Sequence, residues 1–272
     1  MEAFLFPNPV NDRKTELYMY DFNKGLFDYM CNSGIIDTDW KFGLTLVAFA
    51  LISIAVSYLL GSINSAILIS NLIYRDDIRT HGSGNGGMTN MLRTFGLKAA
   101  GLTLLGDLVK TALSIFITGV LLGFYYTHGA SGYLGFCYMS ALFAVLGHVF
   151  PIYYGFKGGK GVLVTAVSAL ILAPIPFLIL LLIFIVVVYF SKYVSLGSVC
   201  GAVIYPVLLN GYFAVFGSNP GGIAQLSVTI IAILVVWCHR ENLKRISTRT
   251  ERKISFKKKD VEVKSEGGEG EN

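Results

Sequence analysis

The chain has 272 residues, of which 54% are hydrophobic and only 14% are charged, and its formal net charge is +5. An average soluble domain carries roughly 25% charged residues, so this composition, with a mean hydropathy of +0.61, excludes an ordinary water-soluble domain. Its four cysteines are scattered and show no CxxC spacing, which argues against a disulfide framework and against a cysteine metal site.

Apolar runs recur along the chain at lengths near the roughly 18 to 20 residues that cross about 30 Å of hydrocarbon as a helix. They do not alternate between apolar and polar residues, as the strands of a membrane barrel would. We therefore expect an all-α integral membrane protein, a bundle of seven transmembrane helices. The expected crossings are 43–64, 99–124, 133–154, 158–173, 174–191, 194–216 and 222–238.

The stretch between Val162 and Phe190 could form one long tilted helix or two helices joined at Pro174 and Pro176, and the distribution of basic residues decides between these readings. Lys and Arg gather in the connection 65–98, beside 155–161, at Lys192 and in the tail, whereas the alternate connections carry none. Cytoplasmic loops attract basic residues, so an even number of crossings should separate Lys160 from Lys192. The prolines are then an external turn, the N-terminus lies outside and the C-terminus is cytoplasmic.

Three parts follow from this topology. Residues 1–42 form an extracytoplasmic N-terminal extension, either an ordered cap or a disordered segment, and contain no apolar core of a signal peptide. Residues 43–253 form the seven-helix membrane domain. Residues 254–272 are a charged cytoplasmic tail, expected to be disordered at its end, while the basic residues that precede and begin it are expected to lie against anionic headgroups.

A glycine-rich segment lies between the first two crossings, on the expected cytoplasmic side. Its backbone N–H groups can turn toward one point, and its hydroxyl, amide and guanidinium groups add further donors, as an anionic oxygen cluster requires. A helix beginning near Thr89 would strengthen such a site. The alternative is a flexible connector. The residues concerned are Gly82, Gly84, Gly86, Gly87, Ser83, Asn85, Thr89, Asn90, Arg79 and Arg93.

A second glycine loop, residues 155–161, contains Lys157-Gly158-Gly159-Lys160, whose lysines could approach a phosphate without obstruction. Alone, this string could equally be a basic anchor in a tight turn. Its expected position on the same face as the first loop favours a shared phosphate site.

Other polar residues are expected to have structural roles. Asp107 and Lys110, three residues apart in the second crossing, should pair along one helical face in a structural role. His148 is expected to be a hydrogen-bonded capping histidine and not a metal ligand. Ser195 and Ser198 open the sixth crossing, where small residues often pack helices.

His239, Asn242 and Arg245 follow the last crossing and would share one helical face. By themselves they could be the interfacial start of the tail.

Taken together, these segments resemble the acylphosphate-dependent glycerol-3-phosphate acyltransferases, integral membrane enzymes of bacterial phospholipid synthesis. The similarity runs from about Leu60 to Glu251, with departures at Gly86, Met88, Val164 and Arg249. The strings that carry it are Gly61-Ser62-Ile63, Asp77-Ile78-Arg79, Gly82-Ser83-Gly84-Asn85, Gly87 with Thr89-Asn90 and Arg93, Asp107 with Lys110, Gly147-His148 with Pro151, Phe156 to Val162, Ser195-Leu196-Gly197-Ser198, and His239-Arg240-Glu241-Asn242 with Arg245 and Glu251.

The resemblance implies transfer of an acyl group from acyl phosphate to the 1-hydroxyl of glycerol 3-phosphate, giving lysophosphatidic acid. It implies no metal or cofactor, a multi-pass protein of the cell membrane with its active site facing the cytoplasm, the two substrates and the bilayer as partners, and no nucleic acid. Ser83, Arg93 and Lys160 would bind the phosphate of glycerol 3-phosphate, and His239 and Asn242 its hydroxyl end. Gly84, Asn85, Gly87, Thr89 and Ser198 would form the acyl-phosphate pocket, and the adjoining substrate-binding positions are Gly82, Asn90, Lys157, Gly158 and Gly159.

Two alternatives remain at this point: a membrane carrier of a phosphorylated metabolite, and a divergent paralogue with altered substrate. A carrier should open to both faces and often has repeated halves. The sequence shows no convincing repeat, and the candidate ligands lie on one expected face, so we favour an enzyme.

Overall fold

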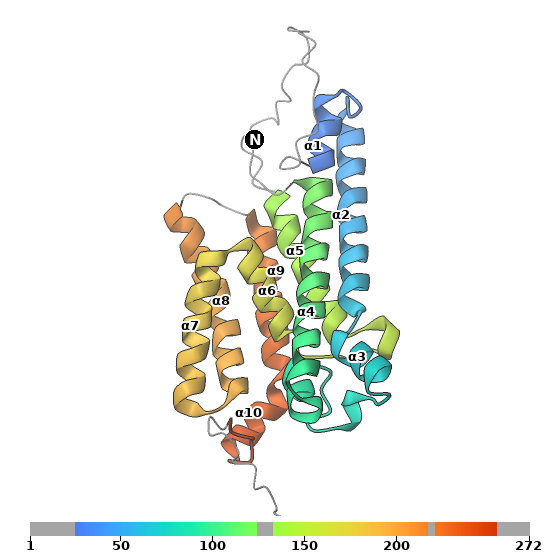
Figure 1. Cartoon of the computed structure of the whole chain (residues 1–272). Helices are drawn as coiled ribbons and strands as arrows, with labels where there is room; N and C mark the ends of the chain where they lie inside the picture. The colour runs from blue at the N-terminus through green and yellow to red at the C-terminus, as the bar shows by residue number, and fades with distance from the viewer. Residues whose placement is uncertain (1–24, 124–132, 217–220, 255–272) are drawn as a thin grey trace, which may run out of the picture.

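The computed structural model describes residues 25–123, 133–216 and 221–254, and the regular structure in these ranges is helical throughout (Figure 1). This confirms the all-α prediction. The helices are α1 Gly25–Asn32, α2 Asp39–Ser62, α3 Ser65–Ile73, α4 Met88–Leu122, α5 Tyr133–Val149, α6 Val162–Leu172, α7 Pro174–Ser191, α8 Val194–Phe216, α9 Gly221–Cys238 and α10 Arg240–Ser247, with single 3-10 turns at Ile78–Thr80 and Ile152–Tyr154.

In the described ranges, six segments are long and apolar enough to cross a membrane: Asp39–Ile73, α4, Leu134–Tyr154, α7, α8 and α9. The chain is therefore a multi-helix integral membrane protein. The expected crossing at 158–173 is shorter than predicted, because α6 starts only at Val162 and has 11 residues. The residues before it form the glycine loop. The long apolar stretch is two helices, since α7 begins at Pro174 directly after α6 ends.

Two helix boundaries differ from the sequence prediction for local reasons. The first crossing ends at Ser62, and Asn64 starts a separate helix, α3, by accepting a hydrogen bond from the Ile67 backbone N–H at 3.1 Å. The second crossing starts earlier than residue 99, because α4 runs back to Met88 across a break at Gly96, whose φ is 83°. A helix thus begins near Thr89, as expected.

Helix α5 is the centre of the bundle and packs against α2, α4, α6 and α9. Its contact with α2 is very close: a methyl group added at Gly61 would lie 2.3 Å from the Ala144 carbonyl oxygen, and one at Gly147 would lie 2.3 Å from that of Tyr58. Small residues permit this approach of two helix backbones in a membrane. The α2–α5 pair is thereby a fixed frame for the segments at its end.

The two ends of the bundle differ (Figure 1). Helix α1 lies at one end, where buried Phe27 packs edge-on against Phe42, with ring centroids 5.0 Å apart. Residues 25–38 of the predicted N-terminal extension are therefore an ordered cap, and α2 starts at Asp39, a few residues earlier than expected. The opposite end gathers α3, the loops around residues 75–87 and 150–161, and α10. Residues 1–24 and 255–272 lie outside the described residues.

Candidate active site

Asn90, in the first turn of α4, organises the first glycine loop. Its buried amide oxygen accepts a hydrogen bond from the Ser83 backbone N–H at 3.1 Å. Its Nδ2 donates to the carbonyls of Ile78, His81 and Asn85 at 2.9–3.1 Å. Gly82 has a φ of 59°, and a methyl group there would lie 2.2 Å from the Asn90 amide oxygen. The loop therefore needs glycine at this position and holds its shape through one side chain.

Arg79 joins the first loop to the second. Its guanidinium pairs with the Asp77 carboxylate at 2.7 Å and donates to the carbonyls of Tyr154 at 2.8 Å and Lys157 at 3.3 Å. The hydrogen bond from Arg79 is the main reason that the pKa of Asp77 lies below its usual value. The Arg79 guanidinium was expected to bind an anionic ligand, but it instead holds the two loops together.

The backbones of the two glycine loops touch directly. The Gly86 N–H donates to the Gly158 carbonyl at 3.3 Å, and the Gly159 N–H donates to the His148 carbonyl at 3.0 Å. A methyl group at Gly158 would lie 2.0 Å from the His148 carbonyl oxygen, and one at Gly159 would lie 2.0 Å from His148 Nε2. Glycine is thus required here for close packing of the second loop against the end of α5 and, at Gly159, against the Gly86 carbonyl of the first loop.

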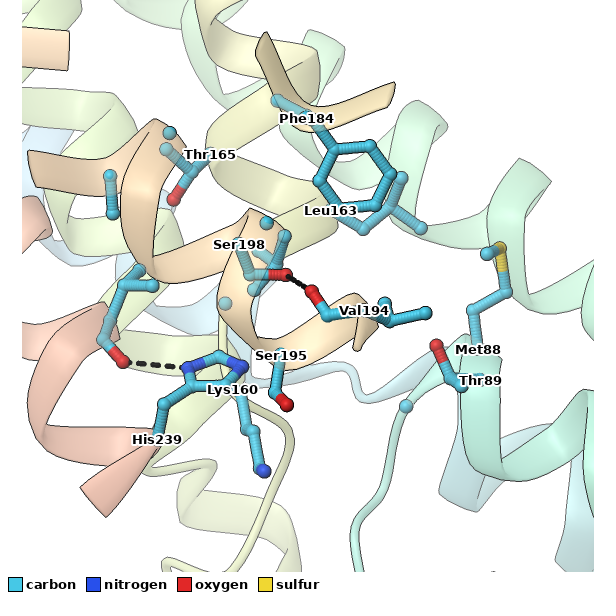
Figure 2. Close-up of a pocket in the computed structure, with 18 of the residues that line it drawn as sticks. Met88, Thr89, Lys160, Leu163, Thr165, Phe184, Val194, Ser195, Ser198 and His239 are labelled. Carbon is cyan, nitrogen blue, oxygen red and sulfur yellow. Dashed lines mark hydrogen bonds between the residues drawn. The ribbon is translucent and has the colours of Figure 1, made fainter. Parts of the chain in front are cut away.

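A cavity of about 510 Å³ opens beside these loops. Its polar part contains every residue predicted to be catalytic and half of those predicted to bind substrate: Ser83, Asn85, Gly87, Thr89, Asn90, Arg93, Lys160, Ser198, His239 and Asn242, together with Ser195 and Glu251. Its apolar part is lined by Leu163, Ala166, Ala169, Phe177, Leu180, Leu181, Phe184, Ala202 and Tyr205. Figure 2 shows Lys160, Ser195, Ser198 and His239 together, with Met88 and Thr89 of α4 placed apart from them.

The remaining predicted substrate-binding residues do not line this cavity. Gly82 and Gly84 lie in the first loop with φ of 59° and 70°, and Gly158 and Gly159 lie where the loops touch. Lys157 is exposed, and its carbonyl accepts from Arg79. These glycines set the backbone course of the two loops, and the neighbouring residues line the cavity.

A chain of hydrogen bonds joins the second loop to the C-terminal segment. Lys160 Nζ donates to the Asn242 amide oxygen, and Asn242 Nδ2 donates to Glu251 Oε1 at 2.7 Å. Glu251 also accepts from Ser195 Oγ at 3.1 Å and from Arg245 Nε at 2.7 Å. The Asn242 amide is held from both sides, so its orientation is fixed.

The pKa values of the charged groups in this hydrogen-bond chain are shifted by burial and by neighbouring groups. Burial lowers the pKa of Lys160, and the nearby Arg245 lowers it further. Burial opposes ionisation of Glu251, but hydrogen bonds from Asn242, Arg245 and Ser195 outweigh it and hold its pKa below the usual value. The spacing of the sequence does not predict this central position of Glu251, because one partner, Ser195, comes from the distant helix α8 and the other two from α10.

His239 presents a proton acceptor to the cavity. Its Nδ1 lies 2.8 Å from the Val235 carbonyl, which can only accept, so Nδ1 carries the hydrogen and Nε2 carries the lone pair (Figure 2). The ring is 4% exposed, and burial lowers its pKa to about 4. It is therefore neutral near pH 7 and can accept a proton.

A buried polar cluster lies behind the cavity wall. Lys110 Nζ is 2.9 Å from Asp107 Oδ1, which confirms the predicted pair. The same nitrogen donates to the carbonyls of Gly61 and Ile63 at 3.1 and 2.9 Å and lies 3.0 Å from His148 Nδ1. His148 was expected to cap its helix; its side chain instead contacts Lys110. Asp107 and His148 both reach the cavity wall.

Fold and cavity together define an integral membrane protein that places a cationic, hydrogen-bonding site next to an apolar chamber. The sequence profile of the glycerol-3-phosphate acyltransferases matches residues 51–249. The chain belongs to this family. The glycerol-3-phosphate acyltransferase of Alkaliphilus metalliredigens (strain QYMF) is 36% identical over 210 residues, which cover 76% of this chain and 97% of the relative.

Solved structures agree. The glycerol 3-phosphate form of PlsY (YgiH), an integral membrane glycerol 3-phosphate acyltransferase, is similar with a TM-score of 0.65 and 29% identity over 76% of this chain and 96% of that one. Its lysophosphatidic acid form gives a TM-score of 0.63 and 28% identity, over 76% and 95% of the two chains. The likeness therefore extends over nearly all of the solved enzyme.

Proposed function

We propose that this acyltransferase takes its acyl group from acyl phosphate and transfers it to the 1-hydroxyl of glycerol 3-phosphate, giving lysophosphatidic acid. One observation carries the proposal: a single cavity joins cations and N–H donors to an apolar chamber. A phosphorylated head group and an acyl chain need these two environments side by side. The similar PlsY structures are described as glycerol 3-phosphate and lysophosphatidic acid forms, which supports this acceptor and this product.

The residues divide between the two substrates. Ser83, Arg93 and Lys160 bind the phosphate of glycerol 3-phosphate, and His239 and Asn242 bind its hydroxyl end. Asn85, Gly87, Thr89 and Ser198 bind acyl phosphate. Gly82, Gly84, Asn90, Gly158 and Gly159 serve these ligands by fixing the loops, and Lys157 adds positive charge at the rim.

The chemistry requires no covalent enzyme intermediate, because acyl phosphate is already activated. The glycerol hydroxyl oxygen attacks the acyl carbonyl carbon, the bond from that carbon to the phosphate oxygen breaks, and phosphate leaves with both electrons. The hydroxyl proton passes to Nε2 of His239 or to a phosphate oxygen. Juxtaposition of the substrates and the cations around the leaving phosphate supply the acceleration.

We also propose that α6 serves as the seventh crossing, with the N-terminus outside and the C-terminus in the cytoplasm of a bacterial cell. Helices α6 and α7 run in opposite directions, and their turn lies away from α10, which supports an even number of crossings between Lys160 and Lys192 (Figure 1). Basic residues gather in the loops at the α10 end, as cytoplasmic loops do. The site then faces the cytoplasm, on the same side as the proposed charged tail (254–272) and opposite the proposed N-terminal extension (1–42).

Lys160 gives the direct test of the proposed site. The variant Lys160→Ala removes a half-buried cation that lines the cavity, whereas Lys98→Ala removes an exposed one that does not. Purified variants in lipid receive acyl phosphate and glycerol 3-phosphate, and mass spectrometry follows lysophosphatidic acid. We expect Lys160→Ala to lose at least about 100-fold in rate, since a charged ligand of phosphate contributes about 3 kcal/mol, and Lys98→Ala to match the wild type. Full activity of Lys160→Ala would disprove the site.

The carrier alternative predicts a different result from the same protein. In sealed vesicles a carrier would accumulate labelled glycerol 3-phosphate without changing it. The acyltransferase forms lysophosphatidic acid and moves no label across the membrane.

A further inference from the structure

Small residues line the sides of the apolar chamber. They are Ala166 and Ala169 on α6 and Gly201 and Ala202 on α8, and on each helix the lining positions continue from turn to turn. A methyl group added at Gly201 would meet no atom within 4 Å, so open space lies directly beside this part of the α8 backbone. The chamber therefore exists because α6 and α8 carry little side-chain volume along this face.

Tyr205 closes the deep end of the chamber. It is the last residue of α8 that lines the cavity, as Ala169 is on α6, and both are buried. About one turn further along these helices, Leu209 and Ala173 are fully buried and do not line it. All four residues belong to one hydrophobic cluster, which also contains the buried ring of Tyr138. At this end the chamber thus meets closely packed protein.

The distance to this closed end limits how much of an acyl chain the chamber can hold. Ser198, which the proposed function assigns to acyl phosphate, precedes Tyr205 by seven residues of α8, and at about 1.5 Å per residue these span roughly 10 Å. Carbon–carbon bonds of about 1.5 Å advance an extended chain by roughly 1.3 Å each, so about eight methylene groups span this distance. A longer chain has to bend or to displace the buried Tyr205 ring.

We propose that Tyr205 selects the length of the transferred acyl chain by ending the chamber that holds it, which rests on the proposed function because that function assigns the chamber to the acyl group. A chain that fits lies between small residues and stops at the ring. Each further methylene meets a packed wall, and a hydrophobic pocket discriminates one misfitting methylene by about tenfold or more. Tyr205 touches the far end of the chain and none of the reacting atoms, so it determines specificity and takes no part in the chemistry.

Two substitutions change the chamber in opposite directions. Tyr205→Ala removes the ring and extends the deep end, whereas Gly201→Leu fills open space along the side. The matched controls are Tyr205→Phe, which keeps the ring, and Gly211→Leu, at an exposed position of the same helix where a methyl group also meets nothing within 4 Å and which does not line the cavity.

The assay gives each protein, in the same lipid, a mixture of acyl phosphates of 4, 8, 12 and 16 carbons with glycerol 3-phosphate. Mass spectrometry reports the four products together, so the ratios do not depend on the amount of folded enzyme, and donor partition into the bilayer cancels between proteins. We expect Tyr205→Ala to raise the 12-carbon product relative to the 8-carbon product at least about tenfold, and Gly201→Leu to lower the 8-carbon product relative to the 4-carbon product by a similar factor. Both controls should keep the wild-type ratios, and KM for glycerol 3-phosphate should be unchanged throughout.

Wild-type product ratios in Tyr205→Ala would overturn the proposal, and so would a shift in Tyr205→Phe as large as that in Tyr205→Ala. If Tyr205→Ala fails to fold, Tyr205→Leu takes its place, because it keeps most of the apolar volume and lacks the far edge of the ring; unchanged ratios in that variant would overturn the proposal equally. Absence of product from every acyl phosphate in the wild type would refute the proposed function, whereas product with the same ratios in every variant refutes the length limit alone.

Discussion

Glu251 should control activity although it donates nothing to a substrate. Its carboxylate accepts hydrogen bonds from Asn242 at 2.7 Å, Ser195 at 3.1 Å and Arg245 at 2.7 Å. Asn242 in turn accepts from Lys160. Removal of the carboxylate frees the amide of Asn242 to rotate, and its oxygen would then no longer be held toward Lys160.

The expected magnitude follows from these bonds. A hydrogen bond to a charged group contributes about 1.5–3 kcal/mol when buried. The Arg245 side chain is 43% exposed, so its ion pair adds at most about 1 kcal/mol. Water can replace part of what is lost, which leaves a destabilisation of about 2–4 kcal/mol for Glu251→Ala. About 1.4 kcal/mol corresponds to a tenfold change in rate. We expect about 1.4–2.7 kcal/mol of the lost interaction energy to appear as misplacement of Asn242 during the reaction, which is a loss of roughly 10- to 100-fold in kcat/KM for glycerol 3-phosphate.

The assay compares Glu251→Ala with Glu241→Ala in lipid, by product formation and by thermal unfolding. Glu241 lies in α10 next to Asn242, its side chain is 65% exposed, and its closest ion-pair distance to Arg240 is 3.9 Å. We expect this control to keep wild-type activity and stability. If Glu251→Ala matched Glu241→Ala in both measurements, the described hydrogen-bond chain would have no role in positioning Asn242.

Three further predictions concern the loops and the proton acceptor. Gly159→Ala should abolish activity, because its methyl group would lie 2.0 Å from His148 Nε2, whereas Gly101→Ala, with nothing within 4 Å, should be as active as the wild type; equal activities would contradict the loop packing. Asn90→Ala should open the first loop to proteolysis and destabilise the protein by about 2–4 kcal/mol through unpaired carbonyls, and unchanged cleavage would refute this. Burial lowers the pKa of His239 to about 4, so the neutral ring contributes stability above pH 6.5 that is lost as the pH falls toward 4; an NMR titration midpoint near 6.5 would contradict it.

The sequence predicted the membrane helices well because hydrocarbon selects long apolar runs. It also placed the turn between α6 and α7 at Pro174, since charge distribution constrained the number of crossings. Helix α3 was missed, because apolar residues continue past Ser62. Its start depends on the Asn64 side chain, a capping signal present in the sequence. It also depends on Lys110 of α4, whose ammonium donates hydrogen bonds to the carbonyls of Gly61 and Ile63.

Within the site, the residue types indicated the chemistry, but they did not indicate which residues line the cavity and which support the loops. Gly159 and Lys160 are neighbours, yet one supports the loop and the other lines the cavity. Arg79 was expected to serve an anion, but Asp77 and two carbonyls occupy it. These roles depend on which atoms lie opposite in space, and sequence spacing does not contain that information.

Donor use is the most direct test of the central claim. Purified protein in lipid is given glycerol 3-phosphate with one acyl donor at a time: acyl phosphate, acyl-CoA or acyl carrier protein carrying the same chain. Lysophosphatidic acid and inorganic phosphate are measured together. The account predicts equal amounts of both from acyl phosphate and no product from the two thioesters. Product from a thioester at a comparable rate, or phosphate release from acyl phosphate without lysophosphatidic acid, would contradict it.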